Sequence, residues 1–84
     1  MVKVDVRYFA SIREALGPRE SVELPPGATL GALRDLLTAR SPAHATVLAR
    51  GRALRCPLDQ TVADESAVVG EGAEVAFFPP VTGG

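Results

Sequence analysis

One stretch of this 84-residue chain has a long helical repeat, and it limits what the rest can form. Four leucines recur there at intervals of one to three residues: Leu30, Leu33, Leu36 and Leu37. The spacing predicts one apolar stripe on a helix of about three turns. Thr29 is a natural N-cap, and Ser41-Pro42 ends the helix because the residue before proline avoids the α region. Arg34 and Arg40 fall outside the stripe, so Leu30, Leu33 and Leu37 are the residues expected to be buried.

The remaining patterns predict strands rather than a second long helix. Apolar and polar residues alternate over 2–8 and again over 19–24, which is typical of strands with one buried face. Residues 10–16 have helical spacing and end at Gly17-Pro18. Residues 52–58 and 74–78 are predicted as strands, 61–63 as a short strand or extended segment, and 43–50 can hold a short helix. Pro25-Pro26-Gly27 and Gly70-Glu71-Gly72 are turn signals. Strands with one principal helix predict an α+β layer, a sheet with the helix across one face.

Composition narrows the possible functions. The 84 residues suffice for one domain but leave little room for a core and a catalytic cleft together. The net charge of −1 and the lack of a long basic run argue against nucleic acid as a partner, and no apolar run reaches the length of a membrane span. Cys56 is the one cysteine, which excludes an internal disulfide and fits a cytoplasmic location.

Few residues favour independent catalysis. His44 is the one histidine and is expected to be an ordinary loop or surface residue, since metal sites and catalytic triads need companions at defined spacing. Cys56 has the apolar parity of its strand and is expected to be a buried structural thiol. The charged groups Asp64-Glu65 and Arg50, Arg52 and Arg55 are expected to be solvated, with docking as the lesser alternative. No metal site and no stably bound cofactor are therefore predicted.

Two phenylalanines have the outward parity and predict a docking patch. Phe78 follows Phe77, so the two rings point to opposite faces of one strand. Phe9 has outward parity on the first strand, and the two rings can lie close together if the first and last strands are neighbours. Val62 can join them. Exposed apolar patches are typical of protein interfaces, although both rings could instead lie under loops at bent strand ends.

The C-terminus has an unusual composition. Pro79-Pro80 favours an extended polyproline II conformation, which predicts a stiff arm over 79–84 after a domain at 1–78. Gly83 and Gly84 follow Val81 and Thr82, and terminal glycines let a carboxylate enter a narrow channel. Such an arm could reach about 20 Å into a partner while the patch docks on its rim.

These features resemble a known family, the small subunits of molybdopterin synthase, which are ubiquitin-like sulfur carriers. The resemblance covers the whole chain, from Val4-Asp5-Val6-Arg7-Tyr8-Phe9-Ala10 to the ending Phe77-Phe78-Pro79-Pro80-Val81-Thr82-Gly83-Gly84. That ending is specific, because thiazole-pathway carriers and ubiquitin share the two glycines but typically lack what precedes them. The chain departs from the family at Leu58-Asp59-Gln60, where Val-Asn is frequent. The resemblance implies a β-grasp fold.

The resemblance also implies a mechanism and partners. An ATP-dependent activating enzyme would adenylate the Gly84 carboxylate, and a sulfur donor protein would convert it to a thiocarboxylate. Gly84 would then deliver sulfur to cyclic pyranopterin monophosphate inside the large subunit of a heterotetrameric synthase. Gly83 would keep the approach clear, while Phe9, Val62, Phe78 and the arm Pro79, Pro80, Val81 and Thr82 would contact the partner. The pterin pocket and acid–base groups would belong to the large subunit.

Other functions remain open from the residues. The chain could carry sulfur for thiazole or for tRNA thiolation. It could be a ubiquitin-like modifier whose Gly84 is joined to lysines of target proteins. It could also be an interaction domain whose C-terminal arm has no chemical role.

Overall fold

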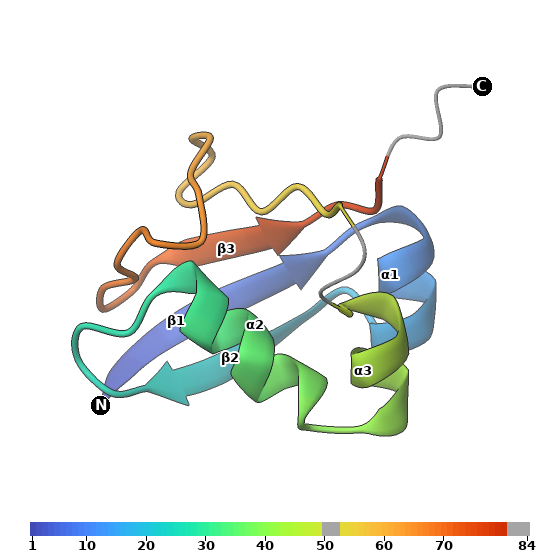
Figure 1. Ribbon diagram of the computed structural model, residues 1–84, viewed down its shortest axis with the longest axis horizontal. Helices are drawn as coiled ribbons and strands as arrows, with labels where there is room; N and C mark the ends of the chain where they lie inside the picture. The colour runs from blue at the N-terminus through green and yellow to red at the C-terminus, as the bar shows by residue number, and fades with distance from the viewer. Residues whose placement is uncertain (50–52, 81–84) are drawn as a thin grey trace.

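The computed structural model describes residues 1–49 and 53–80, and forms a three-stranded sheet with helices on one side (Figure 1). The elements in chain order are β1 (Val2–Tyr8), α1 (Ala10–Leu16), β2 (Arg19–Leu24), α2 (Leu30–Thr38), α3 (Pro42–Val47) and β3 (Glu74–Phe77). The sheet order is β2-β1-β3. The predicted α+β arrangement is confirmed, including the short helix expected near 43–50, which begins one residue earlier as α3.

The first strand lies at the centre of a mixed sheet. β1 pairs antiparallel with β2, with Val4 opposite Val22, and parallel with β3, with Tyr8 opposite Phe77. Alternate residues of β1 are buried, as their period of two predicts. The first and last strands are therefore neighbours, so the residues that follow them emerge side by side.

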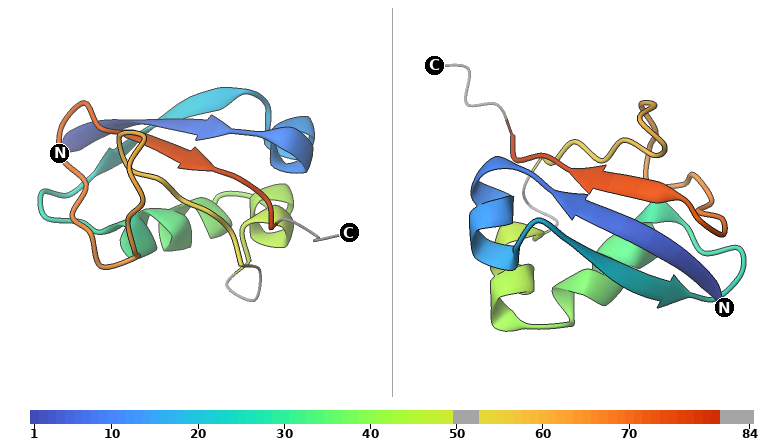
Figure 2. Two further views of the ribbon diagram at one scale, coloured as in Figure 1. Left: turned by 90° about the horizontal axis from the view of Figure 1, so that it is seen from above. Right: turned by 180° about the vertical axis from the view of Figure 1, so that it is seen from behind.

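The principal helix covers one face of the sheet (Figure 2). The Thr29 hydroxyl accepts a hydrogen bond from the Ala32 N–H at 3.1 Å, which confirms the predicted N-cap. Leu30, Leu33 and Leu37 are buried in a common core with residues of all three strands, and burying each contributes roughly 1.5–3 kcal/mol. Leu36 belongs to the same spacing but is 36% exposed, because the sheet covers a narrower arc of the helix than the leucine stripe spans.

The prediction of a regular strand over 52–58 is wrong in part. Arg55 pairs with Phe78 and Leu58 with Val75 as isolated antiparallel bridges along β3. The Pro57 carbonyl accepts from the Ala76 N–H at 3.1 Å, in the same register, but proline has no N–H to return. The described part of this segment therefore covers the outer edge of β3 without forming a continuous ladder. Its inward residues follow the predicted phase, since Leu54, Cys56 and Leu58 pack against the core.

Candidate functional site

Two phenylalanine rings stack where β1 and β3 end. Phe9 and Phe78 have ring centroids 4.4 Å apart and planes inclined by 6°. The parallel pairing of Tyr8 with Phe77 puts the next residue of each strand side by side, and the Phe9 N–H donates to the Phe77 carbonyl at 3.2 Å. Phe77 points to the other face, where it is buried and stacks on Tyr8. The predicted proximity of Phe9 and Phe78 is thus confirmed, and both rings are half-buried.

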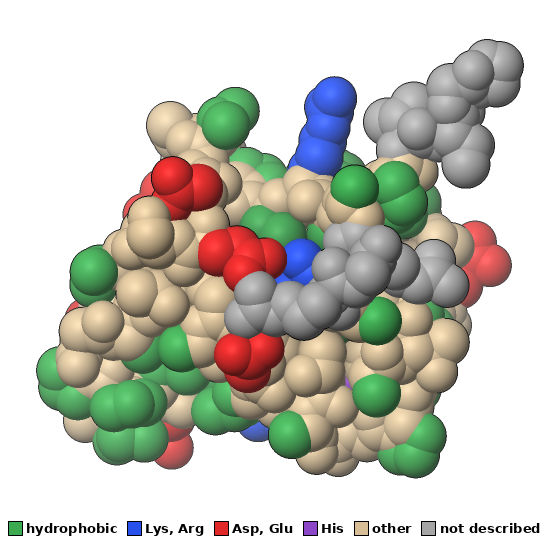
Figure 3. Space-filling view, in the orientation of Figure 1, with side chains coloured by type: hydrophobic (Ala, Val, Ile, Leu, Met, Phe, Trp, Pro, Cys, Tyr) green, Lys and Arg blue, Asp and Glu red, His purple; other side chains and the backbone are tan. Residues whose placement is uncertain are grey.

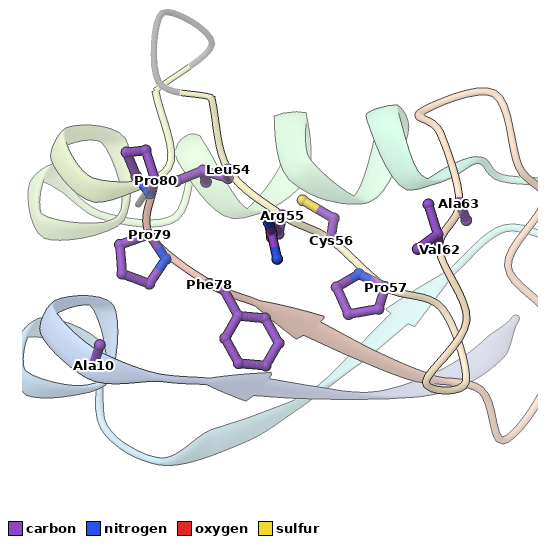
Figure 4. Close-up of a pocket in the computed structure, with 10 residues that line it drawn as sticks. All are labelled: Ala10, Leu54, Arg55, Cys56, Pro57, Val62, Ala63, Phe78, Pro79 and Pro80. Carbon is purple, nitrogen blue, oxygen red and sulfur yellow. The ribbon is translucent and has the colours of Figure 1, made fainter. Parts of the chain in front are cut away.

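A mainly apolar groove of about 930 Å³ adjoins this ring pair (Figure 4). Phe78 lies between its two ends. Val62 and Ala63 stand on one side, and Pro79 and Pro80 line the other, where the chain leaves the sheet (Figure 4). Val62 is 96% exposed, so it lines the same groove as Phe78 without packing on the rings. Exposed apolar surface of this kind is typical of a site that another protein covers.

The segment after Ala53 forms one wall of the groove, next to Phe78. The Arg55 N–H donates to the Phe78 carbonyl at 3.0 Å, and the Phe78 N–H donates back at 2.9 Å. Arg55 itself is exposed, as predicted. Cys56 also lines the groove and is half-buried, not fully buried as its parity predicted. Burial raises the pKa of this thiol, although the Arg34 charge opposes the shift, so Cys56 stays protonated at neutral pH.

The end of the predicted arm lies outside the described residues. Val81, Thr82, Gly83 and Gly84 belong to this part, as do Arg50 and Arg52. Pro79 and Pro80 are described, are half-buried and have no regular secondary structure. The site as described consists of the ring pair, the groove and the start of the arm.

A buried arginine, Arg34, holds the segment after α3 that leads to the groove wall. Arg34 was expected outside the apolar stripe, yet it is 4% exposed. Its Nε donates to the Leu48 carbonyl at 2.8 Å, a terminal nitrogen donates to the Ala49 carbonyl, and the other contacts Glu65 at 3.1 Å. The guanidinium thus binds the end of α3 to α2 and to the 64–67 turn. Leucine spacing could not show this role, because the acceptors are backbone carbonyls distant in sequence.

The one histidine is not an ordinary surface residue. His44 Nε2 lies 2.8 Å from a Glu20 oxygen and Nδ1 lies 2.7 Å from the Ser41 hydroxyl. Tyr8 donates to the same Glu20 carboxylate at 2.6 Å, and Arg40 pairs with its other oxygen. Burial alone would raise the pKa of Glu20, but the hydrogen bonds from Tyr8, His44 and Arg40 outweigh it and lower that pKa. Burial and the Glu20 carboxylate raise the pKa of Tyr8. The cluster joins β1, β2 and α3 and lies apart from the groove.

The charged surface is mixed in sign. Figure 3 shows acidic, basic and hydrophobic side chains interspersed on one face of the molecule. Within residues 1–49 and 53–80, no three histidine, cysteine or acidic residues are grouped so that they could hold a metal ion. No helix in that same part of the chain is long and apolar enough to cross a membrane.

A mixed sheet that holds one principal helix, with the chain leaving after the last strand beside an apolar groove, defines a ubiquitin-like β-grasp domain. The model of the ThiS family matches residues 6–84. The chain belongs to the ThiS family.

Known proteins agree with this assignment. The molybdopterin synthase sulfur carrier subunit of Mycobacterium tuberculosis is 41% identical over 86 aligned positions, which cover 100% of both chains. The crystal structure of SAMP1 from Haloferax volcanii is similar with a TM-score of 0.82 and 26% identity, covering 98% of this chain and 99% of that one. Subunits 1 and 2 of the molybdopterin-converting factor from Helicobacter pylori form a solved complex. It matches with a TM-score of 0.69 and 23% identity over 99% of this chain and 100% of the matched chain, which shows the fold. The resemblance drawn from the sequence is confirmed.

Proposed function

We propose that this chain is the sulfur carrier subunit of a molybdopterin synthase. The observation that carries the proposal is the 41% identity to a protein of that name along the full length of both chains. The site geometry supports it, because the stacked Phe9 and Phe78 rings and the groove lie where Pro79-Pro80 begins the arm. A partner that covers the groove would receive the glycine end in its own interior.

The chemistry of the arm requires an activated carboxylate. An activating enzyme would join the Gly84 carboxylate to the α-phosphate of ATP and release pyrophosphate. The terminal sulfur of a persulfide on a donor protein would then displace AMP, and a thiol would cleave the resulting S–S bond to leave a thiocarboxylate on Gly84. This chain would not bind ATP stably, because the activating enzyme uses the nucleotide. It would also bind no metal stably.

Sulfur transfer would take place inside the large subunit. The Gly84 thiocarboxylate is an anionic sulfur nucleophile. It would attack a carbon of cyclic pyranopterin monophosphate, so that a carbon–sulfur bond forms while a carbon–oxygen bond of that carbon breaks and the oxygen leaves with the electron pair. Hydrolysis of the acyl–sulfur bond would leave the sulfur on the pterin and restore the carboxylate. Two transfers would build the dithiolene. Gly83 would allow close passage, and Phe9, Val62, Phe78 and Pro79 to Thr82 would contact the partner. We place this chemistry in the cytoplasm, which suits the free thiol of Cys56.

Reconstitution tests the proposal. The full chain is incubated with an activating enzyme, ATP and a persulfide donor, and its intact mass is measured. We expect oxygen to be exchanged for sulfur at Gly84, and the large subunit to convert the pterin precursor only with the sulfur-loaded chain. A chain lacking Gly84, or extended beyond it, should keep its fold and lose both steps.

The outcomes separate the alternatives. Sulfur found at any other residue would contradict the mechanism. A loaded chain that serves tRNA or thiazole synthesis but not the pterin would identify another sulfur pathway. Lysine conjugates in place of a thiocarboxylate would identify a protein modifier.

A further inference from the structure

Within the described residues, the outer edge of β2 pairs with no other strand and carries two charged residues, Arg19 and Glu23, that form no ion pair. β2 ends the sheet order β2-β1-β3, whereas the outer edge of β3 is covered by bridges from Arg55 and Leu58. Figure 2 shows β2 bordering the sheet on the side away from β3. An uncovered edge strand presents backbone donors and acceptors to other chains.

The hydrogen-bond phase identifies the free groups of this edge. The Tyr8 N–H donates to the Pro18 carbonyl at 3.0 Å, in register with the β1–β2 pairs. In an antiparallel ladder the bonded pairs alternate, so Glu20, Val22 and Leu24 direct their backbone groups towards β1. The N–H and C=O groups of Arg19, Ser21 and Glu23 therefore point away from the sheet. No residue within 1–49 or 53–80 bonds to them.

The same three residues have exposed side chains on the outer face. Arg19 and Glu23 form no ion pair with any other described residue. Arg19 stands opposite Arg7, whose own charge is matched by Asp5 and Glu74. Like charges directly opposite each other destabilise a strand pair, so Arg19 lacks an acid at this position. Glu23, in contrast, stands opposite Lys3 in the same strand pair, although the two form no ion pair.

We propose that the β2 edge pairs with the β2 edge of a second copy of this chain, as an antiparallel twofold dimer centred on Ser21. In this register Ser21 faces Ser21, and Arg19 of each copy faces Glu23 of the other. All three outward-directed residues then form bonded pairs. Arg19 gains the acid that it lacks across from Arg7, and Glu23 gains a second basic residue beside Lys3. The strand is thus complementary to itself in backbone phase and in charge at one register.

The proposed pairing joins two copies and no more. Each chain has one such edge, and a twofold axis through Ser21 uses both, so the product is a continuous six-stranded sheet rather than a fibre. Three bonded pairs make a small contact, which predicts a weak dimer formed at high protein concentration. The Phe9–Phe78 pair lies beyond β1 and β3, away from this edge. The dimer is therefore independent of the proposed sulfur transfer, and either idea can fail alone.

Charge exchange tests the register. Sedimentation velocity is recorded on the full chain from about 10 µM to 1 mM, the range in which small interfaces associate. We expect concentration-dependent dimers of the native chain. Arg19→Glu and Glu23→Arg should each weaken association at least about tenfold, because each replaces two attractive pairs by two repulsive ones. Mixing the two variants should restore a dimer, since every Glu then faces an Arg.

Two further measurements guard against misfolding and against another interface. Ser21→Pro removes an outward N–H and should abolish the dimer, while Ser21→Ala should keep it, with circular dichroism confirming the fold of both. Amide shifts on dilution should concentrate at Arg19, Ser21 and Glu23. A native chain that stays monomeric to 1 mM would show that these charges only guard the edge. Failure of the mixed variants to associate, or dilution shifts confined to another surface, would equally overturn the proposal.

Discussion

At the scale of single residues, the most consequential side chain is the buried guanidinium of Arg34. Arg34→Met would leave the Leu48 and Ala49 carbonyls and Glu65 without their donor. We expect a loss of about 2–4 kcal/mol in the free energy of unfolding, measured by urea denaturation. The substitution breaks two hydrogen bonds from a buried guanidinium to backbone carbonyls, together with an ion pair to the partly exposed Glu65. Arg13→Met, at an exposed position of α1, is the matched control and should change stability by less than about 0.5 kcal/mol. Equal effects of the two variants would mean that Arg34 does not hold α3.

Glu20 should give the fold a specific dependence on acid. Its pKa is lowered in the folded chain, so its contribution to stability is complete above the unfolded pKa of about 4.3 and is lost as the pH falls through the lower folded value. Glu20→Gln removes this titration. The free energy of unfolding, measured between about pH 7 and pH 3, should therefore fall less steeply for the variant than for the native chain. Parallel pH profiles would contradict the role given to the Tyr8 and His44 hydrogen bonds.

At the scale of elements, the turn at Asp59 and Gln60, between the groove wall and Thr61, has a strained backbone. Asp59 and Gln60 have φ of 49° and 66°, although neither is glycine, and the Leu58 N–H donates to the Thr61 carbonyl at 2.9 Å. Gln60→Gly should raise the free energy of unfolding by about 0.5–1 kcal/mol, since glycine adopts positive φ without a Cβ clash. Asp59→Ala should lower it by about 1–2 kcal/mol, because Asp59 Oδ1 also accepts from the Glu74 N–H at 2.9 Å. Thermal melts of the two variants should shift in opposite directions.

The elements also show how far the sequence could predict this fold. Periodicity identified β1, β2, α1 and α2 because alternation and leucine spacing are local properties. It placed Phe9 beside Phe78 once the first and last strands were taken as neighbours. It could not detect Arg34, His44 or Glu20 as structural groups, since their partners come from distant elements. It also missed the irregular ladder over 55–58, where the absent N–H of Pro57 outweighs the apolar alternation.

At the scale of the whole molecule, two adjacent phenylalanines should divide folding from docking. Phe77 is 1% exposed in the core, whereas Phe78 is half-buried against Phe9 at the groove. Phe77→Ala should lower the free energy of unfolding by about 3–5 kcal/mol. Phe78→Ala should lower it by only about 1 kcal/mol, mainly through the lost ring stacking.

If the proposed function is right, binding to the large subunit should depend more on Phe78 than on Phe77, the reverse of their order in stability. Phe78→Asp should weaken that binding at least about tenfold, because it puts a charge into an apolar contact that the partner would cover, and the domain should stay folded. Val62→Ala is a second variant of the groove. The native Val62 side chain is 96% exposed, so this substitution should have a negligible effect on stability. Calorimetric titration and urea denaturation of the same samples compare the two properties directly. A Phe78→Asp chain that unfolds would show that Phe78 belongs to the core. A folded variant that binds the large subunit as the native chain does would place the docking surface elsewhere on the domain.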